Sequence, residues 1–152
     1  GDSDITGDGD TNDSGETNAK HDTYYVYDDY GNLTYVIPPE VNTSNGVASS
    51  EISGYCYQYK YDHRNRLVEK KIPGKGWESI VYNILDQPIL TQDANLDSQN
   101  KWLFTKYDVF GRVAYTGYIT SGSSRITLQN AANAVTNTHV SKLNSPKLSP
   151  FY

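Results

Sequence analysis

Short runs in which apolar and polar residues alternate, separated by turn-forming residues, occupy the chain from Asp22 to about Thr120. Successive side chains of a β-strand point to opposite faces, so a period of two predicts strands. The longest row places four tyrosines on one face of a single predicted strand, namely Tyr55, Tyr57, Tyr59 and Tyr61. Prolines at 38, 39 and 73 end the runs that precede them, as expected where a backbone N–H is missing. The pattern predicts short strands joined in hairpins.

Four seven-residue segments of this region, 27–33, 61–67, 82–88 and 107–113, align on one template that begins with tyrosine. Its second position is Asp28, Asp62, Asn83 or Asp108, and such side chains open a type I turn by accepting a backbone N–H two residues on. Its fifth position is Gly31, Asn65, Asp86 or Gly111, the residue types that best tolerate the left-handed conformation closing such a turn with a bulge. The template therefore predicts four β-hairpins with the same turn.

The chain divides into three parts. Residues 1–21 contain almost nothing apolar and are expected to form a flexible acidic lead-in. Residues 22–120 form the β-repeat domain, in which the polar stretch from Asn42 to Ser53 is expected to be an inserted loop. Residues 121–152 are expected to be a linker, a short helix within 125–140 and a tail. The fold class is all-β, with consecutive antiparallel hairpins in an open curved sheet or part of a β-shell.

Composition strengthens this view. The chain has 152 residues with 14 tyrosines and no methionine. Tyrosine favours β-strands whose surface is partly exposed to solvent. A net charge of −5 argues against nucleic acid as a partner. No apolar run is long enough for a membrane span. Because the sequence begins with Gly1 and not with methionine, we expect it to be a piece of a longer polypeptide.

Candidate chemistry is sparse, and we expect no catalytic residue and no cofactor. The three histidines, His21, His63 and His139, lie in unrelated contexts, and zinc-ligand spacing is absent. Turn capping explains the template aspartates without catalysis. Residues 8–13 alternate oxygen ligands as calcium loops do, but they lack the required glycine, so a solvated acidic linker is the favoured interpretation. Cys56 is expected to be a small buried apolar side chain.

Aromatic residues are the candidates for ligand binding, because their rings can stack on sugars. The candidates are Trp77, Trp102, Tyr55, Tyr57 and Tyr59. Trp77 follows a glycine-rich turn and is expected to be the more exposed tryptophan, whereas Trp102 precedes Leu103 and Phe104 and is expected to be packed. The alternative is structural, since a repeat sheet with few aliphatic residues must build its core from tyrosine.

At the template residues the sequence resembles the RHS/YD-repeat family, whose signature is Tyr-Asp-x-x-Gly-Arg-Leu. Residues 107–113 fit it best, 61–67 and 27–33 depart at one position each, and 82–88 are degenerate; residues 55–120 are similar to surface RHS proteins of Bacteroidetes. The resemblance implies a sheet that spirals into a hollow shell at the cell surface or outside the cell.

In the family that shell encloses a C-terminal toxin or forms a sugar-associated wall. The expected function is therefore a non-enzymatic structural segment whose partners are the remainder of the same large polypeptide and a C-terminal toxin domain. The alternative is a carbohydrate-binding surface module that uses exposed aromatics.

Overall fold

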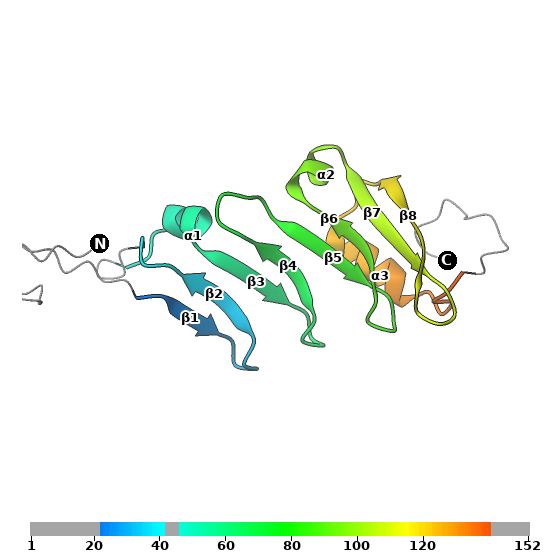
Figure 1. Ribbon diagram of the computed structural model, residues 1–152, viewed down its shortest axis with the longest axis horizontal. Helices are drawn as coiled ribbons and strands as arrows, with labels where there is room; N and C mark the ends of the chain where they lie inside the picture. Colours follow the sequence, from blue (N-terminus) through cyan, green and yellow to red (C-terminus); the bar gives the residue numbers. More distant parts are fainter. Residues whose placement is uncertain (1–21, 42–45, 141–152) are drawn as a thin grey trace, which may run out of the picture.

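The computed structural model describes residues 22–41 and 46–140, and within them eight β-strands form one open antiparallel sheet (Figure 1). The strands follow one another in sequence order, so each pairs with its neighbours along the chain. Their bounds are β1 Tyr24–Tyr27, β2 Leu33–Ile37, β3 Tyr57–Tyr61, β4 Leu67–Lys71, β5 Glu78–Tyr82, β6 Pro88–Gln92, β7 Lys101–Tyr107 and β8 Val113–Thr120. The expectation of consecutive antiparallel hairpins is confirmed.

The four hairpins β1–β2, β3–β4, β5–β6 and β7–β8 share one backbone irregularity. In each, the pairing shifts by one residue just before the turn, so that one residue of the return strand has no partner. The skipped residue always follows the seventh template position: Thr34, Val68, Ile89 or Ala114. A bulge bends and twists a strand locally, so a bulge at the same place bends all four hairpins in the same way.

Pairing between successive hairpins is short. The partners are Tyr35 with Gln58 and Val36 with Tyr57 between β2 and β3, and two further pairs at each of the β4–β5 and β6–β7 junctions. All of these pairs lie away from the template turns, which form a row at one end of the strands (Figure 1). Near the turns, other contacts must therefore join the hairpins.

Three short helices accompany the sheet: α1 Ser49–Tyr55, α2 Ala94–Ser98 and α3 Arg125–Asn133. The helix predicted within 125–140 thus begins at Arg125, where Ser124 caps it by accepting the N–H of Thr127 at 3.2 Å. Helix α3 lies against one face of the sheet at β5. None of the helices in the described part of the chain is long and apolar enough to cross a membrane.

Two sequence-based expectations are wrong around α1. Residues 49–53 were expected in a loop but belong to this helix, whose first turn is held by Glu51 accepting the N–H of Ala48 at 2.8 Å. Tyr55 was expected on a strand with Tyr57, Tyr59 and Tyr61, but it is the last residue of the helix. The chain becomes extended only at Cys56, so the alternating row starts at Tyr57.

The core lies mainly in the C-terminal half of the sheet. One cluster combines strand residues Val81, Ile89, Leu90, Trp102 and Tyr107 with Leu128 and Ala132 of α3. Helix α3 therefore contributes to stability by covering this face. In the N-terminal half, strand β1 exposes every residue, including Tyr25 at 59 % and Tyr27 at 58 %. Most tyrosines of that half are exposed to solvent and do not form a buried core.

Candidate functional site

Each hairpin turn is closed by a residue with positive φ at the fifth template position: 81° at Gly31, 56° at Asn65, 61° at Asp86 and 74° at Gly111. The N–H of this residue donates to the carbonyl of the second position at 2.9–3.1 Å in all four turns. The N–H of the second position donates in turn to the carbonyl of the sixth. This is a type I turn followed by a bulge residue, repeated four times with different side chains.

The second template position holds each turn with its side chain. Oδ1 of Asp62 accepts the backbone N–H groups of Arg64 at 2.9 Å and Arg66 at 3.0 Å. Asp28, Asn83 and Asp108 accept the corresponding pair of N–H groups in their own turns. These oxygens are therefore occupied by the backbone, which is the arrangement that stabilises a turn.

The sixth template position secures the second. Arg66 donates from Nε to Oδ2 of Asp62 at 2.8 Å, and Arg112 does the same to Asp108 at 2.8 Å. Burial of the Asp62 carboxylate would raise its pKa, but the hydrogen bonds from Arg66 and from two backbone N–H groups, together with the guanidinium charge, outweigh burial and lower it. The pKa of Asp108 is lowered by the same balance of effects.

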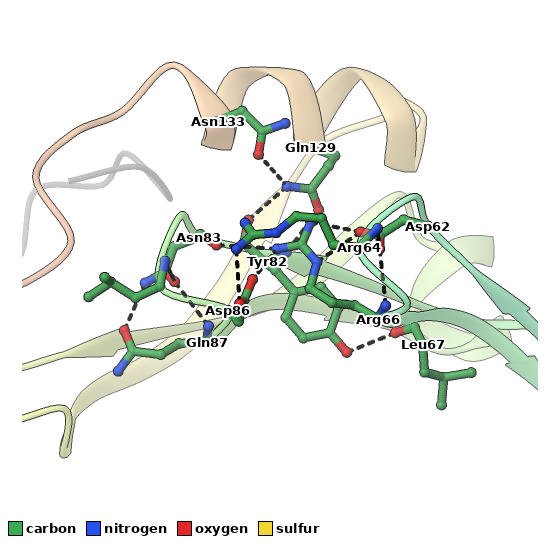
Figure 2. A network of polar contacts seen from close by, with 11 residues as sticks. Asp62, Arg64, Arg66, Leu67, Tyr82, Asn83, Asp86, Gln87, Gln129 and Asn133 are labelled. Carbon is green, nitrogen blue, oxygen red and sulfur yellow. Dashed lines mark hydrogen bonds and ion pairs between the residues drawn. The ribbon is translucent and has the colours of Figure 1, made fainter. Parts of the chain in front are cut away.

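The sixth position also reaches the fifth position of the next hairpin. Arg66 donates from Nη1 to Oδ1 of Asp86 at 2.8 Å, and Arg64 adds a bond to the same carboxylate at 3.0 Å (Figure 2). One junction earlier, Asn32 donates from Nδ2 to Oδ1 of Asn65 at 3.2 Å. These side chains therefore link one turn to the next along the row of turns.

The third junction uses packing in place of a hydrogen bond. A Cβ atom placed on Gly111 would lie 3.3 Å from Nε2 of Gln87, so the sixth-position glutamine lies over the bare glycine of the next turn. The sixth residue of one hairpin thus lies close to the fifth of the next at all three junctions.

The first-position tyrosine completes the junction. Oη of Tyr82 donates to the carbonyl of Leu67 at 2.7 Å, and Oη of Tyr107 donates to the carbonyl of Pro88 at 2.9 Å. Both acceptors occupy the seventh template position of the preceding hairpin. The guanidinium of Arg66 also lies 4.9 Å from the ring centre of Tyr82. The tyrosine that defines the repeat is therefore a contact between hairpins.

The C-terminal segment forms hydrogen bonds with strand backbone groups near the turns. The side-chain amide of Gln129 in α3 accepts the N–H of Tyr82 at 3.0 Å and donates to its carbonyl at 2.8 Å, as a neighbouring strand would (Figure 2). At the next hairpin, the N–H of Val140 donates to the carbonyl of Tyr107 at 2.8 Å. Sequence reasoning missed Gln129, because nothing local links it to Tyr82.

The five aromatic candidates for ligand binding do not converge. Trp102 is 1 % exposed within the core, where its expected packing is observed. Trp77 is half-buried, and Nζ of Lys60 lies 4.2 Å from its ring centre. Tyr59 and Lys60 are consecutive in β3, so their side chains lie on opposite faces of the sheet. Trp77, which contacts Lys60, and Tyr59 are therefore on different faces. Tyr57, 40 % exposed, shares the face of Tyr59, and Tyr55 ends α1.

A groove on the Tyr59 face was not anticipated from the sequence. Its floor is the cross-strand row Ile80, Thr91, Leu103 and Tyr118, and its volume is about 500 Å³. Glu78, paired with Lys70 at 3.1 Å, and the α2 residues Asn95 and Leu96 also line it. Tyr118 is 65 % exposed, so its ring is available to a ligand. Its only sequence signal is a place in the alternation of β8.

The remaining candidates lie apart from one another. His63 is exposed at a turn tip and His139 is exposed after α3, whereas His21 and the acidic stretch 8–13 lie outside the described residues. Cys56 is fully buried and free, and burial raises the pKa of its thiol. Within 22–41 and 46–140, no three His, Cys, Asp or Glu side chains gather as a metal site.

Comparison with other proteins adds no assignment: no family model and no curated protein matches the chain.

Proposed function

We propose that the chain is a non-enzymatic structural segment of a secreted or cell-surface β-repeat protein of the RHS/YD kind, a length of wall in a larger shell. The set of contacts that recurs between successive hairpins carries this proposal. The template side chains hold their own turn and contact the next one, so the repeat motif is explained by architecture. A wall that grows by adding hairpins needs this property.

The charges of the turns support a structural role. Asp28, Asp62 and Asp108 accept backbone N–H groups of their own turns, and the pKa of each is lowered. A general acid at neutral pH needs a raised carboxyl pKa, which is the opposite direction. The partners in this proposal are the remainder of the same polypeptide and, following the family resemblance, an enclosed C-terminal toxin domain.

An antiserum against the chain and intact source cells provide the test. The proposal expects the antiserum to detect a polypeptide far larger than 17.0 kDa that protease added outside the cells removes. A cytoplasmic protein measured in the same cells should survive the protease. Detection of a small polypeptide that survives with the cytoplasmic control would contradict the proposal.

Carbohydrate binding is a second candidate, and the groove beside Tyr118 favours it. An exposed aromatic ring next to Leu103 and Ile80 supplies an apolar platform, while Thr91, Glu78 and Asn95 supply polar groups at its floor and rim. A glycan array screened with the purified chain tests this candidate. Tyr118→Ala should abolish binding, whereas Trp77→Ala, on the other face, should retain it. Equal binding by both variants, or no binding by the parent chain, would exclude the groove.

A further inference from the structure

We propose that the row of hairpin turns binds the surface of a lipid bilayer through the apolar side chains at its tips. The third and fourth template positions form the tip of each turn, between the residue that opens the turn and the residue that closes it. In the last two hairpins both positions are apolar, with Ile84 and Leu85 in one turn and Val109 and Phe110 in the next. The inference goes beyond the structural role proposed above and does not depend on it.

The apolar tip residues are exposed and lie on neighbouring turns. Their exposed fractions are 39 % at Ile84, 60 % at Leu85, 65 % at Val109 and 78 % at Phe110. The two turns are in contact, because Gln87 of one lies over Gly111 of the other. These side chains therefore gather in one patch, which we call the tip patch. Apolar residues that gather on a surface in this way mark a contact site, whereas single exposed ones do not.

The arrangement of the turns fits a broad surface. All four turns lie in a row at one end of the strands, so one surface can meet several tips together (Figure 1). At the tip of the first turn, Tyr30 is 81 % exposed. A tyrosine ring has an apolar body and a polar hydroxyl, and it favours the boundary between lipid and water.

The hydrogen bonds of the turns lower the cost of leaving water. A backbone group that enters an apolar environment must keep a hydrogen bond. In the last turn, Oδ1 of Asp108 accepts the N–H groups of Phe110 at 2.9 Å and Arg112 at 3.0 Å. The N–H of Gly111 donates to the Asp108 carbonyl at 2.9 Å, and the turn at Asn83 repeats all three bonds. The N–H groups of the fourth, fifth and sixth positions are thus satisfied within each turn.

The charges beside the tip patch balance, so apolar contact and not net charge must drive the binding. Three acids and three arginines form ion pairs here over 2.7–3.0 Å, namely Asp62, Asp86, Asp108, Arg64, Arg66 and Arg112. The Asp108 side chain is 8 % exposed and that of Arg112 is 67 % exposed, so the guanidinium can reach a lipid phosphate. The net charge of −5 opposes adsorption of the whole chain to an anionic surface.

A second copy of the chain is the alternative occupant of the tip patch. A stable interface between proteins buries about 800 Å² on each partner and involves about 20–30 residues a side. Two turn tips supply far less than this. A bilayer has no such requirement, because a few inserted apolar side chains give reversible binding that grows with the apolar area they bury.

Co-sedimentation of the full chain with phosphatidylcholine vesicles measures the binding. Phe110→Ala should weaken partitioning about tenfold, because it removes the largest side chain of the tip patch. Tyr118→Ala is the matched control. It removes a ring that is 65 % exposed but lies near the other end of β8, so partitioning should not change. Vesicles that also contain phosphatidylglycerol should bind no more tightly, since the charges beside the tips balance.

Phe110→Trp tests insertion directly and keeps an aromatic ring at the tip. The fluorescence that it adds to the parent spectrum should shift to shorter wavelength with vesicles, and Tyr118→Trp should show no shift. The inference is overturned if the parent does not co-sediment, if Tyr118→Ala weakens partitioning as much as Phe110→Ala, or if vesicles leave the Phe110→Trp spectrum unchanged. Binding that needs phosphatidylglycerol and survives Phe110→Ala would be adsorption by charge and would overturn it too.

Sedimentation equilibrium without lipid tests the second copy. The inference expects the parent and Phe110→Ala to have the same mass. A parent dimer that Phe110→Ala dissociates would show that the tip patch binds protein, and the bilayer would be the wrong partner. None of these failures affects the structural role, because that role rests on contacts between hairpins and not on the tips.

Discussion

Replacing Gln129 with leucine removes the side chain of α3 that forms hydrogen bonds with the backbone N–H and carbonyl of Tyr82. Gln129 is 8 % exposed, and its amide makes two bonds to Tyr82, at 3.0 and 2.8 Å, and a third to Asn133 at 2.9 Å. Leucine has a similar volume, so the main loss is polar. Leaving a buried donor or acceptor without a partner costs about 1–3 kcal/mol for each group. With two backbone groups affected and some access for water, we expect a loss of about 2–4 kcal/mol.

Urea unfolding with linear extrapolation measures this loss, and the slope should stay constant because the variant buries the same surface. Hydrogen exchange adds a local test, since the Tyr82 amide should exchange faster while the Leu90 amide in the hairpin ladder changes less. Asn133→Ala is the control. It removes only the outer bond to Gln129 and should cost less than about 1 kcal/mol. A Gln129→Leu loss below about 0.5 kcal/mol, with the Tyr82 amide still protected, would refute the strand-like role of the amide.

Three further predictions concern single side chains. Tyr82→Phe removes the hydroxyl bonded to Leu67 and should cost about 0.5–1.5 kcal/mol in urea unfolding, whereas Tyr30→Phe, at an 81 % exposed turn position, should cost nothing measurable. The folded pKa of Asp62 lies below its ordinary value of 3.8, so its contribution to stability is present above that value and is lost as pH falls through the folded pKa. The melting temperature of Asp62→Asn should therefore fall less than that of the parent below about pH 4, and equal slopes would count against the ion pair. The thiol of Cys56 is buried with a raised pKa, so it should react with a thiol reagent only in denaturant; rapid reaction of the native chain would contradict its burial.

The hairpins could be predicted because their information is local. Asp or Asn at the second position and Gly, Asn or Asp at the fifth act within one turn, and all four fifth-position residues have positive φ. The helices α1 and α2 were not foreseen. They have seven and five residues, too few for a periodic apolar face to appear in the sequence. Alternation alone also placed Tyr55 on a strand, whereas the chain becomes extended only after it.

Contacts between hairpins depend on which turns lie side by side, so they required the structure. The sequence shows Arg66 and Asp86 as template residues, but only the sheet places the guanidinium of one hairpin against the carboxylate of the next. The pairing of Gln129 with Tyr82 is another such case, since they lie 47 residues apart in sequence. The neighbours of Trp102 in the sequence predicted that it would be packed, but only the structure shows that Leu128 and Ala132 of α3 belong to the same cluster.

A double-mutant cycle on Arg66 and Asp86 tests most directly the claim that template side chains join one hairpin to the next. The cycle compares urea unfolding of the parent, Arg66→Ala, Asp86→Ala and the double variant, and it cancels the loss of the Arg66–Asp62 contact within the turn. The pair is 2.8 Å apart, with Arg66 9 % and Asp86 49 % exposed, so solvent screens it only in part. We expect a favourable coupling of about 1 kcal/mol. A coupling within about 0.3 kcal/mol of zero would show that the two residues act independently, and would contradict the account.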